Sequence, residues 1–156
     1  MPRFSVVTPV HDPSVDGLRA CADSVLGQSH SDWEWVISDD ASSDAEVVAY
    51  LDELARDQRV TLIRREVNGG IVAATNDALR VASGEFVAFL DHDDLLTPDA
   101  LSAVDEVLLG DDSIDFLYSD EDKIDDDGNR SQRFTKPAWS PERLRAQNYC
   151  SHLSVM

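Results

Sequence analysis

The chain has 156 residues, of which 42% are hydrophobic, and this suits a single domain with a core of its own. Its 31 acidic and 13 basic residues give a formal charge of −18, which argues against nucleic acid or an anionic membrane surface as a partner. No apolar run approaches the roughly 18 residues that a membrane span needs, and residues 1–10 do not resemble a signal peptide. We therefore expect a cytoplasmic protein whose two cysteines are free thiols.

Strands and helices are predicted to alternate along the chain. Apolar runs predict strands over residues 4–8, 33–38, 60–64, 86–90 and 116–119, with a further strand within 150–156. Helical spacing predicts helices over 15–26, from a cap at Ser42 or Ser43 to 57, over 71–81, and over 98–109 with Pro98 at its first position. The alternation predicts one α/β domain over residues 1–156, with a mostly parallel sheet covered on both faces.

Polar residues follow three of the predicted strands directly. Thr8 and Pro9 end the first, Asp39 and Asp40 end the second, and Asp91–Asp94 follow the fourth. Because ligands on parallel sheets bind beyond the carboxyl ends of the strands, we expect these residues to gather along one edge. That edge would hold several carboxylates and few cations. A like-charge pair at roughly 4 Å costs on the order of 4 kcal/mol at an effective dielectric constant near 20, so a positive charge belongs there.

A divalent cation fits this charge pattern better than the other acidic motifs do. An EF-hand loop starting at Asp91 would need glycine sixth and glutamate twelfth, but Leu96 and Ser102 stand there. No glycine-rich phosphate loop of the GxGxxG or GxxxxGK[ST] type is found. Mg²⁺ or Mn²⁺, held by one or two carboxylates with water and substrate phosphates, is the remaining interpretation.

Four motifs in order carry a resemblance to a known family. VVTPVHDP, VISDDASSD, the helix start containing two glycines, and FLDHDDLLTPDAL resemble the nucleotide-binding half of family 2 glycosyltransferases. The resemblance extends from residue 4 to about residue 156 and implies the GT-A fold, a Rossmann-like three-layer α/β/α sandwich. The later stretch, from YSDEDKIDDDG to SHLSVM, resembles bacterial members that build O-antigen or other surface polysaccharides.

The resemblance implies an inverting transfer from a UDP- or dTDP-sugar to a saccharide or lipid-linked saccharide acceptor. By the family pattern, Thr8 to Val10 line the nucleoside pocket, and Asp40 accepts a hydrogen bond from N3–H of uracil or thymine. Asp39 supports that loop or the ribose. Asn68 to Gly70 form a loop close to the base, where glycine permits a close backbone approach.

The Asp-X-Asp motif of the family matches Asp91, His92 and Asp93. The resemblance implies that Asp93 binds Mn²⁺ or Mg²⁺ directly and that Asp91 lies near both the ribose and the metal. His92 is the variable middle position, counted with the nucleotide-binding residues although we expect its side chain to face solvent. We interpret Asp94 as a residue that precedes the next helix, and His152 as structural.

The general base of such an enzyme lies, by resemblance, beyond Met156. We therefore expect a nucleotide-sugar-binding domain truncated before its acceptor-binding part, with exposed apolar surface or self-association as a consequence. In the full-length protein it would be cytoplasmic, or peripheral at the inner face of the membrane. Asp120 to Asp122 are either acceptor-side residues or a solvated turn, and Asp125–Asp127 an exposed turn. The alternatives left open are a receiver-like phosphoacceptor domain and a non-catalytic nucleotide- or metal-binding module.

Overall fold

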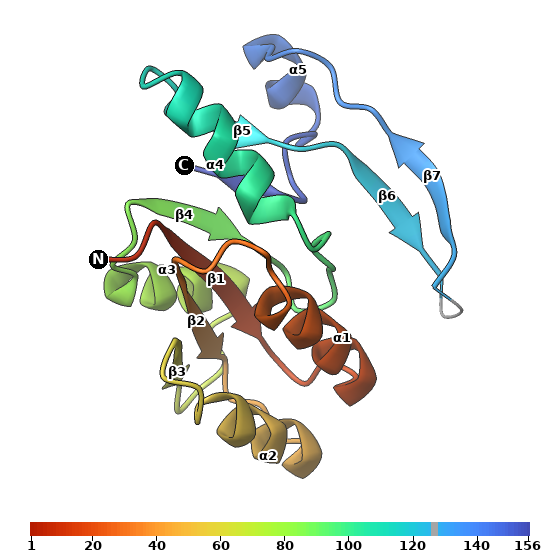
Figure 1. Ribbon diagram of the computed structural model, residues 1–156. Helices are drawn as coiled ribbons and strands as arrows, with labels where there is room; N and C mark the ends of the chain where they lie inside the picture. The colour runs from red at the N-terminus through yellow and green to blue at the C-terminus, as the bar shows by residue number, and fades with distance from the viewer. Residues whose placement is uncertain (126–127) are drawn as a thin grey trace.

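Helices cover both faces of a central sheet in the computed structural model, which describes residues 1–125 and 128–156 (Figure 1). The strands of this sheet are β1 (Phe4–Val10), β2 (Trp33–Asp39), β3 (Val60–Arg64), β4 (Phe86–Phe89), β5 (Leu117–Tyr118) and β8 (Ser154–Val155). The helices are α1 (Val15–Leu26), α2 (Ala45–Leu54), α3 (Ile71–Val81), α4 (Ala100–Gly110) and α5 (Pro141–Ala146). A separate hairpin consists of β6 (Glu121–Ile124) and β7 (Arg130–Phe134).

The central sheet has the strand order β3-β2-β1-β4-β8-β5. β1 pairs in parallel with both β2 and β4, and β2 pairs in parallel with β3. β8 is antiparallel to its two neighbours, β4 and β5. The α/β fold class with a mostly parallel sheet is therefore confirmed, and the last strand of the described chain is inserted inside the sheet rather than added at its edge.

Alternate residues of the strands point to opposite faces of the sheet, and each face buries a different set of helices. Val6 and Trp35 pack on one face against α1, α2 and α4, in the larger of the two clusters of buried side chains. Val7 and Val36 point to the other face and pack against Ala78 of α3. Both β1 and β2 are buried on both faces, which explains why their sequences are almost continuously apolar.

Two helix starts differ from the sequence prediction. α2 is capped by Asp44, whose carboxylate accepts hydrogen bonds from the N–H groups of residues 46 and 47, and not by Ser42 or Ser43. Those serines are used elsewhere, because they bond to Asp12 of the β1–α1 loop. α4 begins at Ala100 instead of residue 98, and its cap residue makes no side-chain hydrogen bond.

The C-terminal third contains elements that the sequence did not indicate. The β6–β7 hairpin and α5 are short and mostly exposed, so they lack the apolar periodicity on which the prediction rested. β8 occupies only Ser154–Val155 of the strand expected within 150–156. The turn predicted at Asp125–Asp127 includes two residues outside the described ranges. Within the described residues, no helix has the length and apolarity to cross a membrane.

Register places the ends of the parallel strands at one edge of the sheet. Val10 lies opposite Asp39 of β2, which in turn lies opposite Arg64 of β3. Val7 lies opposite Phe89, so the residues that follow β4 emerge at the same edge. The expected gathering of the three polar strand ends along one edge is thereby confirmed, and the end of β3 joins them.

A hydrogen-bonded carboxylate lies at the opposite edge of the sheet and joins β1, β2 and the start of β4. One carboxylate oxygen of Glu34 accepts bonds from the Ser5 hydroxyl at 2.6 Å and from the Ser83 N–H at 2.6 Å. The Ser5 hydroxyl also accepts a bond from the Gly84 N–H at 2.7 Å. Burial raises the pKa of Glu34, but these hydrogen bonds outweigh burial and hold the pKa below its usual value.

We predict that Glu34→Gln lowers the free energy of unfolding by about 1 kcal/mol at pH 7, since the charge on the acceptor is lost. The folded pKa is depressed, so the stabilisation by Glu34 is present above the unfolded-state pKa of roughly 4.3 and disappears as the pH falls through the folded value. Urea unfolding at pH 7, 4 and 3 should show the difference shrinking with acidity. The exposed Glu106→Gln is the charge-matched control, and a constant difference at all three pH values would contradict the prediction.

Candidate functional site

A buried carboxylate at the end of β2 organises the first half of the site. Asp40 is 2% exposed, and its two oxygens accept hydrogen bonds from the Gly69 N–H at 2.9 Å and the Gly70 N–H at 2.7 Å. The Arg65 Nε atom lies 2.8 Å from one of these oxygens. Burial raises the pKa of Asp40, but the two N–H groups and the arginine outweigh it and lower the pKa overall. Asp40 therefore stays ionised and fixes the loop before α3.

The loop from Asn68 to Gly70 has a backbone conformation that favours glycine at its last position. Gly70 has φ of 80°, in the left-handed region that other residues rarely adopt, and it begins α3 as the cap residue. The Asn68 side-chain oxygen also accepts a hydrogen bond from the Gly70 N–H, at 3.0 Å. The side chains expected near a base, Asn68 and Asp40, thus converge on one backbone amide.

Two arginines lie at this edge, where the sequence analysis expected few cations. Arg64 Nε lies 3.5 Å from the Asp39 carboxylate, and Arg65 pairs with both Asp40 and Asp77. Arg64 ends β3 and Arg65 follows it; β3 is the one parallel strand whose end the sequence analysis did not consider. The same strand-end argument, applied to β3, would have found them.

Asp39 and Asp12 hold the loops that flank the edge. The Asp39 carboxylate accepts a bond from the Ser42 N–H at 2.9 Å, so it supports the β2–α2 loop, as the resemblance implied in part. Asp12 accepts bonds from the N–H groups of Ser43 and Asp44 at 2.7 and 3.0 Å. These N–H groups lower the pKa of Asp12 below its usual value. The β1–α1 and β2–α2 loops are therefore fixed to each other.

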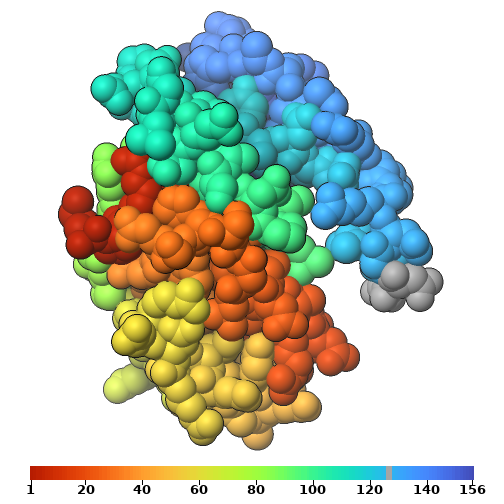
Figure 2. Space-filling model, in the orientation of Figure 1, coloured from red at the N-terminus to blue at the C-terminus, as the bar shows by residue number. Residues whose placement is uncertain are grey.

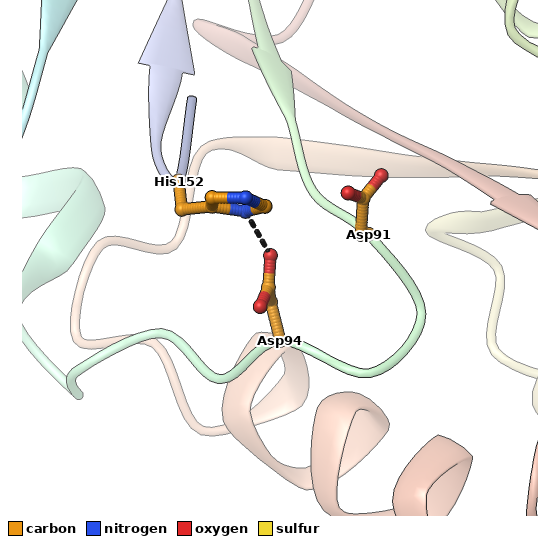
Figure 3. Close-up of side chains that lie close together, drawn as sticks. All are labelled: Asp91, Asp94 and His152. Carbon is orange, nitrogen blue, oxygen red and sulfur yellow. Dashed lines mark hydrogen bonds and ion pairs between the residues drawn. The ribbon is translucent and has the colours of Figure 1, made fainter. Parts of the chain in front are cut away.

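The second half of the site lies between β4 and β8 (Figure 3). Asp91, Asp94 and His152 each offer one ligand atom, and these atoms all lie within 4.8 Å of one another. The imidazole Nδ1 of His152 lies 2.5 Å from the Asp94 carboxylate. His152 comes from the segment before β8, whereas both aspartates follow β4, so the group forms only in the folded chain. The sequence analysis set aside Asp94 and His152, and their proximity carried no sequence signal.

Asp93 and His92 lie beside this group. Asp93 is exposed, and His92 is half-buried with its Nδ1 atom 3.3 Å from the Pro9 carbonyl oxygen. The structure therefore brings Asp91 together with Asp94 and His152, while the metal-binding role of Asp93 stays a prediction. The half-buried imidazole of His92 faces the end of β1, in place of the solvent-facing position that we expected.

Among the described residues, the carboxylates that follow β4 outnumber the basic side chains that contact them. Burial raises the pKa of Asp94 above its usual value; the nearby His152 opposes this rise, and Asp91 and Asp93 add to it. Burial likewise raises the pKa of the Cys21 thiol to about 12, with smaller contributions from these three carboxylates. Two carboxylates and an imidazole are ligands that divalent metals accept in proteins, so this donor set fits a bound cation.

Residues at the end of β1 lie mostly inside the core. Thr8 is fully buried, and its hydroxyl accepts a hydrogen bond from the Trp35 indole N–H at 2.9 Å. Val10 is also buried, and its carbonyl oxygen accepts a bond from the Asp40 N–H at 2.7 Å. The structure therefore gives the Thr8 hydroxyl a partner within the sheet and leaves the backbone at Pro9 and Val10 as the part of β1 nearest the site.

A pocket of about 370 Å³ borders the Asp91 group. Asp91 and His152 line it together with apolar side chains that include Phe89, Phe116 and Met156. The β6–β7 hairpin, in light blue, forms the right-hand edge of the molecule in Figure 2. The edge of the sheet thus holds the Asp40–Arg65 pair, the candidate metal group of Asp91, Asp94 and His152, and the pocket beside that group.

Comparison with known proteins gives a consistent result. The family described as Glycosyl transferase family 2 matches residues 5–154. The O-antigen biosynthesis protein RfbC of Myxococcus xanthus is 41% identical over 156 residues, which are 99% of this chain and 12% of that protein.

Solved structures agree with this family. S. aureus TarS 1-349 in complex with UDP-GlcNAc matches with a TM-score of 0.68 and 28% identity, over 74% of this chain and 33% of that one. The mannosyltransferase PcManGT of Pyrobaculum calidifontis, in complex with GDP-Man and Mn²⁺, matches with a TM-score of 0.66 and 27% identity, over 75% and 35% of the two chains. The chain thus spans a small part of RfbC and about a third of each solved structure.

The expected GT-A fold is confirmed by these neighbours, whose architecture the mostly parallel sheet shares. The receiver-like alternative receives no support, because the family match extends over nearly all of the chain. The motifs on which the resemblance rested lie at the strand ends that form the site. The chain belongs to glycosyltransferase family 2.

Proposed function

We propose that this chain binds the nucleotide-sugar donor of a glycosyltransferase that builds a bacterial surface polysaccharide. The observation that carries the proposal is the Asp91, Asp94 and His152 group at the carboxyl edge of a sheet, in a chain matched by the family over residues 5–154. The transfer would be inverting, from a UDP- or dTDP-sugar to a saccharide or lipid-linked saccharide. The name of RfbC, an O-antigen biosynthesis protein, supports the polysaccharide assignment.

The donor set of the second half fits a divalent cation, and Mn²⁺ suits it better than Mg²⁺ does. Mg²⁺ is bound mainly by oxygen ligands, whereas His152 offers a nitrogen. Asp91, Asp94 and His152 would hold the ion, and Asp93 of the same loop is the further carboxylate that the family motif supplies. When bound, the ion would contact diphosphate oxygens and offset the negative charge of the leaving nucleotide. PcManGT, which is similar, was solved with Mn²⁺.

The first half of the site would hold the base and ribose. Asp40 is ionised and fixed by the Gly69 and Gly70 N–H groups. One of its oxygens accepts only the Gly70 bond among the described residues, so it retains capacity for the N3–H of uracil or thymine. We assign the base to this carboxylate, with Asn68 and Gly70 beside it. The backbone at Pro9 and Val10 would border the nucleoside from β1.

The acceptor side is assigned only in general terms. The pocket next to Asp91 and His152 offers space there, and its apolar lining would accept a neighbouring part of a longer protein or of the acceptor. We assign the general base to none of Asp40, Asp91, Asp93, Asp94 and His152. For a lipid-linked acceptor, we propose a cytoplasmic location at the inner face of the membrane.

Nucleotide binding tests this function directly. Calorimetry of the chain with UDP, dTDP and GDP, each with and without Mn²⁺, should show metal-dependent binding of UDP or dTDP. Stabilisation by beryllofluoride, an analogue of a phosphoryl group, would favour a receiver-like domain instead. Binding of nucleotide without transfer by any longer form of the protein would leave the non-catalytic module as the correct description.

We predict that Asp93→Asn and His152→Gln each weaken Mn²⁺-dependent UDP binding at least about tenfold. His152→Gln removes a ligand atom of the candidate metal group, and Asp93→Asn removes the charge of the carboxylate that the family motif supplies. Calorimetric titration with and without Mn²⁺ measures the effect. Asp99→Asn is the matched control, since Asp99 is exposed on the same loop and its side chain makes no cap bond. Loss in Asp93→Asn together with unchanged binding in His152→Gln would restrict the metal site to the Asp-X-Asp motif.

We predict that Asp40→Asn weakens UDP binding by about tenfold or more, since a hydrogen bond to a charged group contributes about 1.5–3 kcal/mol. Cytosine has an acceptor at N3 where uracil has a donor, so the parent chain should prefer UDP to CDP. The variant should narrow this preference, because an amide can present either a donor or an acceptor.

The comparison of UDP with CDP separates base recognition from loop support. Asp40 also holds Gly69 and Gly70, so a purely structural role would weaken both nucleotides equally. If the ratio of UDP affinity to CDP affinity is unchanged in Asp40→Asn, Asp40 does not contact the base and only supports the loop from Asn68 to Gly70.

A further inference from the structure

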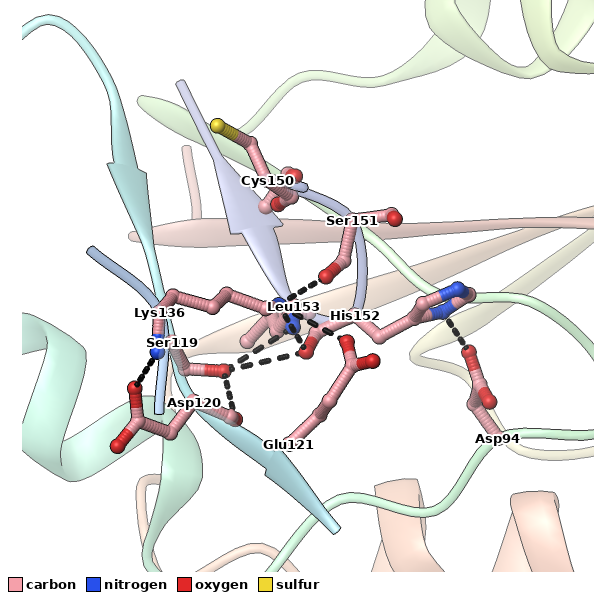
Figure 4. A network of polar contacts seen from close by, with 10 residues as sticks. Asp94, Ser119, Asp120, Glu121, Lys136, Cys150, Ser151, His152 and Leu153 are labelled. Carbon is pink, nitrogen blue, oxygen red and sulfur yellow. Dashed lines mark hydrogen bonds and ion pairs between the residues drawn. The ribbon is translucent and has the colours of Figure 1, made fainter. Parts of the chain in front are cut away.

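A buried lysine lies behind the candidate metal group. The side chain of Lys136, in the segment after β7, is only 1% exposed. Its ammonium donates to the carbonyl oxygens of Ser151 and His152, the second at 3.1 Å, and lies 3.0 Å from the Glu121 carboxylate (Figure 4). An ammonium has three N–H donors, and each finds one acceptor here.

The contacts of the buried Lys136 ammonium stabilise the structure around it. A buried ammonium is tolerated only where a counter-charge and hydrogen bonds replace its hydration, and Glu121 with the two carbonyl groups supplies both. Removing the lysine would take this partner from Glu121 and from the Ser151 carbonyl oxygen. The His152 carbonyl oxygen would keep the longer bond from the Ser119 hydroxyl, at 3.4 Å. The position of the Ser151–His152 backbone is therefore coupled to Lys136.

The backbone at Lys136 is also held by hydrogen bonds. The Lys136 N–H donates to the Asp120 carboxylate at 2.8 Å, and the Tyr118 hydroxyl donates to the Pro137 carbonyl oxygen at 2.7 Å. The N–H group lowers the pKa of Asp120 below its usual value. Asp120 and Glu121, whose role the sequence left open, thus bond to the backbone and the ammonium of Lys136.

The backbone that Lys136 holds is the one that presents His152. His152 has φ of 61°, a region that non-glycine residues occupy only where surrounding contacts impose it. Its carbonyl oxygen faces the lysine, while its imidazole extends the other way, to 2.5 Å from Asp94 (Figure 4). The lysine and the metal group therefore contact opposite ends of one residue.

We propose that Lys136 is a positioning residue that fixes His152 for metal binding. This inference rests on the proposed function, because it assigns His152 to a divalent cation. Lys136 itself touches neither the ion nor the donor. It determines where the imidazole lies, and through Glu121 and Asp120 it couples the β6–β7 hairpin to the site.

The first test observes His152 without any metal. The chain has four histidines and two lysines, Lys136 and the exposed Lys123. In spectra of ¹⁵N-histidine-labelled protein, Lys136→Met should shift the His152 ring signals toward those of a free imidazole. The His30 signals, from a ring that lies 3.3 Å from Asp105, should stay unchanged. Lys123→Met is the matched control and should move neither set.

The second test uses a double-mutant cycle on Mn²⁺ affinity, measured by calorimetry with UDP present. Lys136→Met alone should lower the affinity by about tenfold, as expected for a residue that orients a metal ligand. In a His152→Ala background the same change should have little further effect, because the residue that it positions is gone. A purely structural lysine would instead give the same loss in both backgrounds.

The outcomes separate this inference from the proposed function. Unchanged His152 signals in Lys136→Met, or equal affinity losses in the two backgrounds, would overturn the positioning role. Mn²⁺ affinity that does not depend on His152 would overturn the metal assignment, while the spectra would still decide whether Lys136 fixes the ring. If Lys136→Met does not fold, Lys136→Arg serves instead. It keeps the charge beside Glu121, but its guanidinium is larger and presents its donors in a fixed plane, so a smaller shift of the same signals is expected.

Discussion

The parallel pairing of β1 with both β2 and β4 determines where the aspartates of the candidate site lie. Parallel neighbours end at the same edge, so residues separated by more than 50 positions in sequence, such as Asp40 and Asp91, emerge at one edge on either side of β1. A slip of one residue in either pairing would turn the apolar side chains of β1 to the wrong faces. Burial on both faces therefore fixes the register, and the register fixes the site.

The two halves of the edge manage negative charge differently. Around Asp40 the chain supplies its own compensation, from Arg65 and the N–H groups of Gly69 and Gly70. Around Asp94, among the described residues, the His152 imidazole opposes the carboxylates, and burial raises the pKa of Asp94. The negative charge of the first half is thus balanced within the protein, whereas the second half has a donor set that fits a divalent cation. A nucleotide diphosphate matches this division, because its base is neutral and its phosphates need a metal.

Sequence patterns predicted the parts of the molecule that depend on local periodicity. Strands β1 to β4 and helices α1 and α3 follow from apolar spacing, and the strand-end argument located Asp40 and Asp91. The β6–β7 hairpin and α5 bury little and carry no such period, so they were missed. The roles of His152 and Lys136 could not be predicted in this way either, because they depend on contacts with Asp94 and Glu121 that form only in the folded chain.

The insertion of β8 between β4 and β5 has a consequence for the order of folding. Ala88 and Phe89 pair with Val155 and Ser154, so the sheet closes across most of the second half of the chain. Bringing distant segments together costs loop entropy before any contact repays it, which makes such pairings slow and late. The same docking brings His152 to Asp94. Completion of the sheet therefore also completes the candidate metal group, and a chain in which β8 is not docked keeps Asp40, Asp91 and Asp94 at the edge while lacking His152.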